Sequence, residues 1–471
     1  MSDICFLTAR ALAQLIQQRK LSALEVMQAH LAQIERVNPH VNAIVTLVAE
    51  QALDNARKAD DALARGEVTG VLHGLPVAHK DLEDTAGIRT TYGSPIFKDH
   101  VPEADALIVE RLRGAGAITL GKTNTPEFGA GSQTYNRIFG ATLNPYDLGK
   151  TCGGSSGGAA VALACGMLPI ADGSDMGGSL RNPAAFCNVV GLRPSPGRVP
   201  SWPNNQLWGA LSVDGPMART VGDVALVLSA MAGADARVAL ALTDAPAQFA
   251  RPLQRDLRGV RVAWLGELPG VVFDSRVRNV VNAQRVTFET LGCIVEEATP
   301  DFSDADEIFQ TLRAYSFVMS MRENYERHKD DLKDTIIWNY EQGLKLSAQD
   351  VAQAEVKRAQ LWQRVRVFME RYEFMVLPVT QVPPFDVTLP YVTEIAGVPM
   401  PNYIAWMKSC YYISVLGNPA LSVPAGFTDA GLPIGLQIVG RMRDDWGVLQ
   451  MGHAFEQATE YWRRRPKIVM T

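Results

Sequence analysis

The stretch from residue 151 to residue 200 constrains the fold of this chain more than any other part of its sequence. Two glycine-rich turns, CGGSSGG at 152–158 and MGGS at 176–179, enclose an alanine-rich run and a short apolar run. Glycine at this density marks backbone that needs unusual dihedral angles or close approach to another group. The stretch therefore predicts either plain turns that join strand and helix, or a site built from backbone groups.

Short β-type runs alternate with helical stretches from about residue 70 onward. The run LPVAHK is followed by the helix-like EADALIVERLRGAG and then by AITLGK, which is the rhythm of an α/β sheet. The same reasoning predicts strands at LPIADGSD, GVRVAWLG, CIVEEA, FMVLPV, ALSVPA and IGLQIVG. The expected fold class is α/β.

The N-terminal segment, residues 1–66, differs from this rhythm and is expected to be helical. The letters SALE at 22–25 form a capping box, and an apolar stripe at helical spacing follows until Asn38-Pro39 should end the helix. We expect this segment to pack on the sheet and to carry no chemistry.

A second helical segment is expected at residues 303–372, which are rich in charged residues and helix formers. Sheet-type sequence lies on both sides, in 67–302 and in 373–471, so the segment is interpreted as an insertion. Because the later strands are apolar enough to join the same core, residues 1–471 are expected to form a single domain.

The composition describes a globular protein with a large core, with 47% hydrophobic and 20% charged residues among 471. The net charge of −5 and the scattered lysines and arginines give no basic patch for nucleic acid. The first residues lack the pattern of a secretory leader, and no run of about 18 apolar residues could span a membrane. We therefore expect a cytoplasmic protein whose partner is a small molecule, not nucleic acid or a membrane.

The cysteines and histidines favour metal-free chemistry. The six cysteines lie far apart without a C-x-x-C pair, and the seven histidines include neither H-x-x-x-H nor H-E-x-x-H. These spacings argue against a disulfide framework and against a metal site, and no cofactor is expected.

The glycine-rich turns allow one specific chemical interpretation besides plain turns. A phosphate-binding loop would need G-x-x-x-x-G-K-[ST] or G-x-G-x-x-G after a strand, and neither occurs. An acyl-transfer site would use Ser179 as nucleophile, with successive backbone N–H groups of the loop stabilising the oxyanion by about 2.7–4 kcal/mol each. The glycines at 177 and 178 would let a substrate come close.

A serine nucleophile needs a neighbour that accepts its proton. His73 and His79 stay as candidates, although neither lies in a context that marks a base. Lys80 ends the apolar run LPVAHK, where a charged side chain is least expected. Its ordinary pKa of about 10.4 would have to be lowered by burial or by a positive neighbour. Taken alone, Lys80 is better explained as an ion-paired core lysine than as a base.

Several motifs, taken in order, resemble the amidase signature family of serine hydrolases. They are GLPVAHKD at 74–81, CGGSSGG, DMGGSLRNPAAFCNVVGLRPSPGRVP at 175–200, and the later NPALSVPAGF and GLPIGLQIVGR. The resemblance implies a mixed central β-sheet covered by helices on both faces. It also implies metal-independent hydrolysis of a carbonyl C–N bond through an acyl-enzyme.

By this resemblance Ser179 is the nucleophile, Ser155 the relay serine and Lys80 the base. Ser155 and Ser179 are 24 positions apart, and Lys80 lies 75 positions before Ser155, as in the family. In the family the peptide bond before the relay serine is cis, which here is Gly154–Ser155.

The resemblance also implies supporting residues. The backbone N–H groups of Met176, Gly177, Gly178 and Ser179 are expected to form the oxyanion hole. Ser156 is expected to hydrogen-bond within the site, whereas Asp175 and Arg181 are interpreted as a charged brace for the glycine loop.

The sequence departs from the family pattern at His79, Cys152 and Asn188. His79 matters most because it adjoins Lys80. Neighbouring residues of a strand point to opposite faces, so His79 is expected to face away from Lys80.

The substrate pocket is expected from segments outside the signature. Three segments stand out, namely residues 121–128, residues 201–208, and the insertion with its return through PYVTEIAGVPMPNYIAWM. Their aromatic residues favour an apolar pocket, although each could be an ordinary packing residue. These aromatic residues are Trp202, Trp208, Tyr403 and Trp406.

The expected substrates are small apolar or aromatic amides, with carbamates (urethanes) or esters as further members, and the family suggests a homodimer. Two alternatives stay open. One is the A-type component of a glutamine amidotransferase, which would need partner chains and a polar glutamine pocket. The other is a non-catalytic binding protein, against which the joint presence of Lys80, Ser155 and Ser179 argues.

Overall fold

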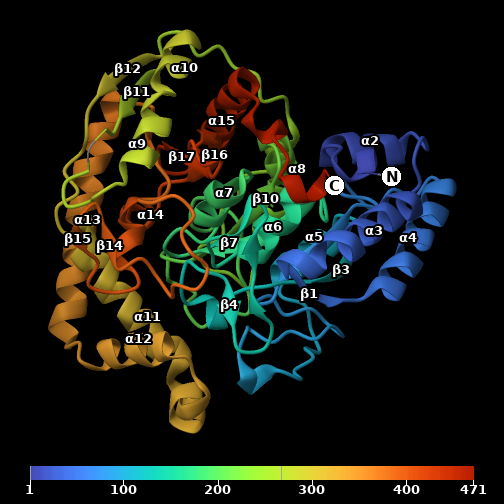
Figure 1. The fold of residues 1–471 in the computed structure, drawn as a ribbon, viewed down its shortest axis with the longest axis horizontal. Helices are drawn as coiled ribbons and strands as arrows, with labels where there is room; N and C mark the ends of the chain where they lie inside the picture. The colour runs from blue at the N-terminus through green and yellow to red at the C-terminus, as the bar shows by residue number, and fades with distance from the viewer. Residues whose placement is uncertain (1, 267, 471) are drawn as a thin grey trace.

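The computed structural model describes residues 2–266 and 268–470, and its centre is an 11-stranded sheet (Figure 1). In spatial order the strands are β1 (Ile44–Leu47), β3 (Ile118–Thr123), β2 (Pro76–Lys80), β8 (Ile170–Asp175), β10 (Val213–Ala218), β9 (Val190–Arg193), β16 (Ala420–Phe427), β17 (Pro433–Gly440), β13 (Phe374–Pro378), β11 (Arg261–Trp264) and β12 (Ile294–Glu297). Two-stranded ribbons are formed by β4 (Tyr135–Asn136) with β5 (Gly140–Ala141), β6 (Leu143–Asn144) with β7 (Asp147–Thr151), and β14 (Glu394–Ile395) with β15 (Val398–Pro399).

The sheet is mixed, as predicted. Strand β2 runs parallel to both β3 and β8, and β11 runs parallel to β12 and β13. The strands between β8 and β13 pair antiparallel, and so does β1 with β3. Strand β2 therefore has a neighbour on each side, and Lys80 ends an interior strand.

Helices cover both faces of the sheet. One core cluster packs the sheet against α3 (Ala23–Val41), α6 (Gly157–Ala164), α7 (Arg181–Cys187), α11 (Ala305–His328), α13 (Ala348–Arg371) and α14 (Lys408–Leu416). The other packs it against α2 (Ala9–Gln17), α5 (Leu107–Gly114), α8 (Val221–Met231), α9 (Ser275–Asn282), α10 (Arg285–Thr290) and α15 (Asp445–Thr459). Successive strand residues alternate between the clusters, so that Val77 belongs to the second and Ala78 to the first.

Further helices and 3-10 turns complete the chain. They are α1 (Ser2–Cys5), α4 (Ala49–Ala64), α12 (Asp334–Leu344) and the 3-10 turns η1 (Pro95–Phe97), η2 (Glu127–Gly129), η3 (Pro246–Ala250), η4 (Lys329–Asp331), η5 (Ala405–Met407), η6 (Tyr461–Arg463) and η7 (Lys467–Val469). The C-terminal segment returns to the N-terminal helices, where Arg36 donates to the carbonyl of Val469 (Figure 1).

All the strands named from the sequence are present, as β2, β3, β8, β11, β12, β13, β16 and β17. The insertion contains α11, α12 and α13, and in Figure 1 these helices form the arm at the lower left. Nine strands in the described part of the chain were not predicted. Three belong to the main sheet, namely β1 inside the supposedly helical N-terminal segment, β9 and β10, and the other six are the short strands of the two-stranded ribbons.

The predicted end of the first long helix was wrong by two residues. Helix α3 contains Pro39 and runs to Val41, because Asn42 closes it. Asn42 adopts a left-handed conformation (φ 52°) and donates its N–H to the carbonyl of Asn38 at 2.8 Å. The capping box of Ser22 and Glu25 at its start is formed as predicted.

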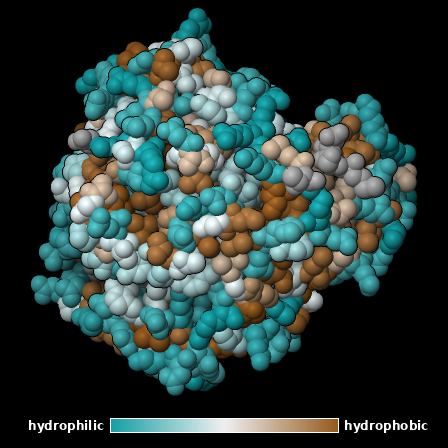
Figure 2. Space-filling model, in the orientation of Figure 1, coloured by the Kyte–Doolittle hydropathy of each residue, from teal (hydrophilic) through white to brown (hydrophobic). Residues whose placement is uncertain are grey.

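The surface in Figure 2 carries polar side chains over most of the visible face, with apolar residues in small separate groups. Within residues 2–266 and 268–470, no helix is both long and apolar enough to cross a bilayer.

Candidate active site

Lys80 lies at the end of β2 with no exposed surface. Its ammonium nitrogen Nζ is 2.8 Å from Ser155 Oγ and 2.9 Å from Ser174 Oγ. Its backbone N–H donates to Asp172 Oδ1 at 2.8 Å. Because β8 is the parallel neighbour of β2, two of its polar residues lie next to Lys80 and fix both ends of that residue.

Ser155 occupies the turn before α6, and the peptide bond Gly154–Ser155 is cis. The carbonyl of Gly154 accepts a hydrogen bond from Ser132 Oγ at 2.8 Å. The turn is glycine-rich because other backbone comes very close: a Cβ on Gly158 would stand 2.3 Å from the backbone nitrogen of Asn124. The glycines therefore allow dense packing of the backbone around Ser155.

Ser179 lies in the loop between β8 and α7 and is partly exposed, whereas Ser155 is 2% exposed. The carbonyl of Ser179 accepts the N–H of Ser156 at 3.2 Å, which holds the two glycine-rich turns together. Ser156 Oγ in turn accepts the N–H of Ser174 at 3.4 Å. Burial thus increases along the three residues assigned by resemblance: Ser179 is partly exposed, Ser155 is almost fully buried and Lys80 is fully buried.

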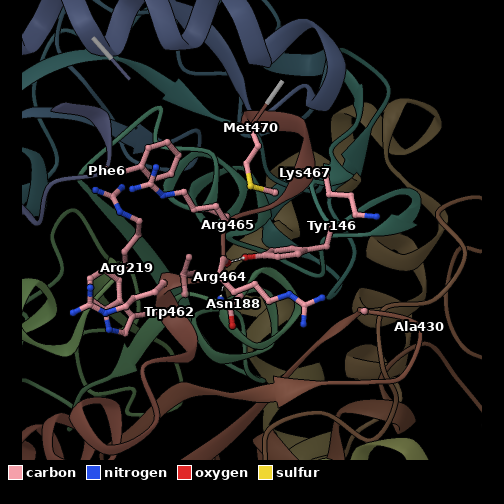
Figure 3. A pocket seen from close by; sticks show the side chains of 14 residues that line it. Phe6, Tyr146, Asn188, Arg219, Ala430, Trp462, Arg464, Arg465, Lys467 and Met470 are labelled. Carbon is pink, nitrogen blue, oxygen red and sulfur yellow. Dashed lines mark hydrogen bonds between the residues drawn. The ribbon is translucent and has the colours of Figure 1, made fainter. Parts of the chain in front are cut away.

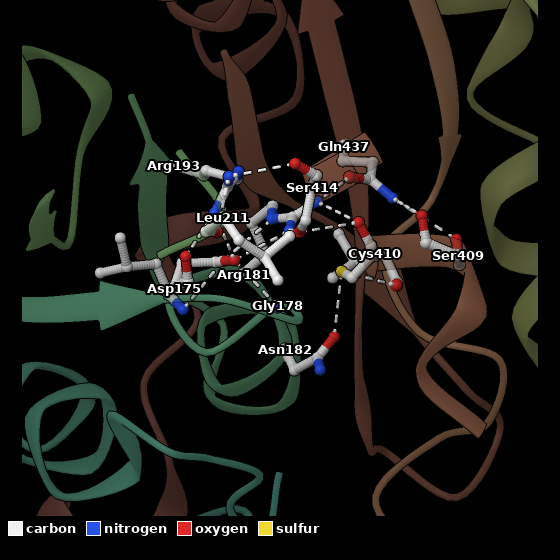
Figure 4. Close-up of polar contacts among 12 residues, drawn as sticks. Asp175, Gly178, Arg181, Asn182, Arg193, Leu211, Ser409, Cys410, Ser414 and Gln437 are labelled. Carbon is white, nitrogen blue, oxygen red and sulfur yellow. Dashed lines mark hydrogen bonds and ion pairs between the residues drawn. The ribbon is translucent and has the colours of Figure 1, made fainter. Parts of the chain in front are cut away.

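Asp175 ends β8 and binds the glycine loop directly (Figure 4). Its carboxylate accepts the N–H groups of Gly178 at 2.9 Å and Leu180 at 3.2 Å. It also forms buried ion pairs with Arg181 at 2.9 Å and Arg193 at 3.2 Å. Burial would raise the pKa of Asp175, but the two guanidiniums outweigh it and hold that pKa well below its usual range.

Arg181 extends this network to the C-terminal part of the chain. Its guanidinium donates to the carbonyl of Cys410 at 3.0 Å, to Gln437 at 2.9 Å and to Ser414 at 2.8 Å (Figure 4). The loop of Ser179 is therefore anchored to α14 and β17, which follow the helical insertion.

The expectation of four oxyanion donors needs one correction. The N–H of Gly178 points at Asp175 Oδ1, so this donor is already used inside the loop. The candidates that stay are the N–H groups of Met176, Gly177 and Ser179.

Burial is the main influence on Lys80 and lowers its pKa to about 8. The carboxylates of Glu83, Asp214, Asp172 and Asp175 oppose this effect. Burial raises the pKa of Asp214 to about 6 and that of Glu83 well above its usual range. Burial therefore favours the neutral form of Lys80 as well as the neutral forms of Asp214 and Glu83.

His79 belongs to the other side of β2. Its Nδ1 lies 2.5 Å from Asp172 Oδ2 and its Nε2 lies 3.0 Å from the hydroxyl of Thr119, while Lys80 contacts Ser155 and Ser174. This arrangement agrees with the expected opposite orientation of the two neighbours.

The aromatic residues of the expected pocket have different places. Trp406 is 1% exposed and packs on Phe186 and Phe385 in the core, whereas Trp208 is 79% exposed. Trp202 lines a cavity of about 230 Å³ together with Glu83, Asp84 and Asp214. Tyr403 is linked to the loop of Ser179 through Arg313, because its hydroxyl accepts a hydrogen bond from Arg313, which also contacts Met176.

A larger cavity of about 760 Å³ lies apart from these residues, between the C-terminal segment and Phe6 (Figure 3). Arg219, Arg464, Arg465 and Trp462 are among its lining residues, and none of the predicted site residues lines it.

Several residues of the site were not singled out in the sequence, namely Ser132, Asp172, Ser174, Arg193 and Arg313. One feature of the sequence could have indicated Asp172 and Ser174: both are polar and lie two positions apart, on the same face of the predicted strand LPIADGSD. In the described part of the chain, no group of three or more His, Cys, Asp or Glu side chains could hold a metal ion.

Comparisons with known proteins agree on one family. A family model described as Amidase matches residues 25–449. The chain is 35% identical to an acylamidase of Rhodococcus erythropolis over 98% of each chain. It is 36% identical to the A-type component of the glutamyl-tRNA(Gln) amidotransferase of Geobacillus stearothermophilus, over 96% of this chain and 97% of the other.

Solved structures are similar over the same length. A bacterial aryl acylamidase of the amidase signature family superposes with a TM-score of 0.91 at 28% identity, covering 98% of both chains. The peptide amidase of Stenotrophomonas maltophilia gives a TM-score of 0.83 at 26% identity, also covering 98% of both.

Proposed function

Because the chain belongs to the amidase signature family of hydrolases, we propose that it cleaves small amides with Ser179, Ser155 and Lys80 and without a metal ion. The observation that carries the proposal is the 2.8 Å hydrogen bond between Lys80 Nζ and Ser155 Oγ. Lysine is almost never fully buried unless it is paired, and the partners here are serine hydroxyls. Such a lysine is suited to exchange a proton with Ser155.

Acylation begins with Lys80 in its neutral form. Lys80 takes the proton of Ser155 while Ser155 takes that of Ser179, whose Oγ attacks the carbonyl carbon. The N–H groups of Met176, Gly177 and Ser179 stabilise the oxyanion. The lowered pKa of Lys80 supports this step, because a base is most effective when its pKa is near the working pH.

The same relay run backwards releases the amine. Lys80 returns its proton through Ser155 to the departing nitrogen, which is a poor leaving group unless protonated. Water then attacks the acyl carbon while the relay takes a proton from that water. The bond between the acyl carbon and Ser179 Oγ breaks, and the relay returns the proton to Ser179 Oγ. The products are a carboxylic acid and an amine, or an alcohol, carbon dioxide and an amine where the substrate is a carbamate.

The test is release of 4-nitroaniline from 4-nitroacetanilide and from ethyl N-(4-nitrophenyl)carbamate by the purified chain alone. We expect release by the wild type, and a loss of at least about 10³-fold in Ser179→Ala, whose folding is checked by circular dichroism. The faster substrate distinguishes an amide preference from a urethane preference. Unchanged release by Ser179→Ala would refute the assignment of the nucleophile.

A second candidate is the hydrolytic component of a glutamine-dependent amidotransferase, which the similarity to the Geobacillus stearothermophilus protein favours. That role predicts ammonia release from L-glutamine and no release of 4-nitroaniline from either anilide. Hydrolysis of an anilide by the chain alone favours the first proposal.

A further inference from the structure

Helix α11 turns Phe309 and Arg313 toward the loop that carries Ser179. Phe309, Arg313 and Phe317 follow at intervals of four and so share one helix face. Phe309 reaches the loop at Gly177, where an added Cβ would stand 3.1 Å from the ring atom Cζ. Arg313 Nη1 lies 3.2 Å from Met176 Sδ. Arg313 is thus placed beside the residues that precede the proposed nucleophile.

The guanidinium of Arg313 is buried without a counter-charge. The residue is 6% exposed, and its Nη2 donates to Tyr403 Oη at 2.7 Å. Its Nε is buried and has no hydrogen-bond partner within the described residues. Across residues 2–266 and 268–470, no carboxylate lies within 4.0 Å of the guanidinium. A buried cation in this state is costly, and a carboxylate that accepts two of its N–H groups would offset that cost.

Aromatic rings hold this cation in place. Cζ of Arg313 lies 4.8 Å from the ring centre of Phe317 and 5.8 Å from that of Tyr403. The hydroxyl of Tyr403 also accepts a hydrogen bond from Asn339 on α12. The guanidinium is therefore oriented by its neighbours while part of its donor capacity stays unused.

A second cation flanks the same region through the loop at 129–131. A Cβ on Gly129 would stand 3.5 Å from Ser155 Oγ, and a Cβ on Gly131 would stand 4.0 Å from both Lys333 Nζ and Tyr403 Cε2. Lys333 forms no ion pair within 4.0 Å among the residues described. Lys333 directly, and Arg313 through Tyr403, thus both lie near the loop at 129–131, in which Gly129 adjoins Ser155.

We propose that Arg313 is a specificity-determining residue that binds a carboxylate of the substrate. The amides that this enzyme hydrolyses best would then carry an anionic group near the scissile bond. The inference rests on the proposed function and narrows its substrate class. The sequence predicts an apolar pocket, whereas this inference places one cation, the guanidinium of Arg313, among its apolar residues.

The test uses binding to Ser179→Ala, so that turnover does not disturb it. Isothermal titration calorimetry compares N-succinyl-4-nitroaniline with its neutral counterpart N-butyryl-4-nitroaniline, and 4-acetamidobenzoate with its methyl ester. The two pairs place the carboxylate on the acyl side and on the amine side of the amide. We expect at least one anionic ligand to bind about tenfold or more tightly than its neutral partner.

The same measurement in Ser179→Ala/Arg313→Met should bring that ratio close to one, and Arg313→Lys should restore only part of it. The matched control is Arg322→Met, on the same helix but exposed and paired with Glu326, which should leave the ratio unchanged. No preference for either anionic ligand, including no measurable binding of all four, overturns the inference. A preference that persists without Arg313 overturns it as well. Release of 4-nitroaniline by the wild type separately reports on the proposed function.

Discussion

Asp172 binds His79 through one carboxylate oxygen, at 2.5 Å, and the backbone N–H of Lys80 through the other, at 2.8 Å. One buried carboxylate on β8 therefore fixes two consecutive residues of β2. It also adds a negative charge that favours the protonated form of Lys80. Asp172 is thus connected both to the stability of the sheet and to the basicity of the proposed base.

Asp172→Asn is expected to change both properties. Loss of the charge lowers the pKa of Lys80 further, so the rise of kcat/KM with pH should move to lower pH. An amide cannot accept from both partners as the carboxylate does, and a buried N–H left unpaired costs about 1–3 kcal/mol. A pH–rate profile and urea unfolding measure the two effects.

Asp214→Asn is the matched control, because it removes a charge that acts on Lys80 without touching His79. It should shift the profile in the same direction, and an unmoved profile in both variants would refute the electrostatic coupling.

The wild type should become more active as pH rises through about 8. Lys80 must be neutral to accept a proton, and burial lowers its pKa to about 8. The expected profile of kcat/KM therefore rises below that pH and levels above it. Lys80→Arg keeps a cation that cannot lose its proton, so it should lose about 10³-fold or more at every pH. A flat profile across this range, or an active Lys80→Arg, would exclude Lys80 as the base.

Lys80→Met should stabilise the fold while abolishing activity. The folded pKa of Lys80, about 8, is below the ordinary value of 10.5, so the folded state binds fewer protons than the unfolded state between these pH values. Stability is therefore gained as pH rises through that window, and at neutral pH the charged lysine costs up to about 3 kcal/mol. Removing it should raise the free energy of unfolding at pH 7 by about 1–3 kcal/mol. Lys357→Met, which replaces a partly exposed lysine paired with Glu307, is the control and should change the free energy of unfolding by less than about 1 kcal/mol. Equal behaviour of the two variants would contradict the cost assigned to Lys80.

Much of the sheet could be predicted because its strands are apolar and bounded by turns. Strand β10 could not, since its letters VDGPMA contain Asp, Gly and Pro, which are poor signals for a central strand. The structure gives the reason for one of them: a Cβ on Gly215 would stand 2.5 Å from the carbonyl oxygen of Leu192. Strand β10 therefore depends on a tertiary contact with the backbone at Leu192, which no local sequence pattern indicates.

The candidate site likewise contains residues that could be predicted from the sequence and residues that could not. Lys80, Ser155 and Ser179 were assigned through long motifs, whose residues are close in sequence or belong to one strand end. Arg193 and Arg313 were not found, because each acquires its role from packing against distant segments. In the sequence, helix α11 is part of a charged insertion, and only the folded chain places its Phe309 and Arg313 against the glycine loop.

Asp175→Asn should be strongly destabilising. The substitution leaves the buried guanidiniums of Arg181 and Arg193 without their shared carboxylate, and breaking a buried ion pair by removing one partner costs about 3–5 kcal/mol. It also weakens the hold on Gly178 and Leu180, so activity should fall with stability. Urea unfolding and 4-nitroaniline release measure the two. Asp256→Asn, which breaks the exposed pair with Arg258, should have no measurable effect. Similar small effects in both variants would show that the network is not a brace.

Gly178→Ala tests whether the glycine loop needs its glycines for space as well as for backbone conformation. Gly178 has φ +114°, and an added Cβ would stand 2.7 Å from both Asn182 Nδ2 and Cys410 Cβ. Gly66 is the matched control, because its φ of +81° is also positive but no atom lies within 4 Å of an added Cβ. Gly66→Ala should cost about 1–2 kcal/mol from backbone strain alone.

Gly178→Ala should exceed that cost by about 1–3 kcal/mol, the usual penalty for overpacking a dense interior. Activity should fall further than stability, since any shift of the loop moves both Ser179 and the oxyanion donors, and misplacement by about 1 Å can cost about 100-fold in rate. Urea unfolding and 4-nitroaniline release on both variants separate the two effects. Equal unfolding costs for Gly66→Ala and Gly178→Ala, with activity retained in the latter, would mean that the loop adapts to a side chain and that its glycines are not required for close packing.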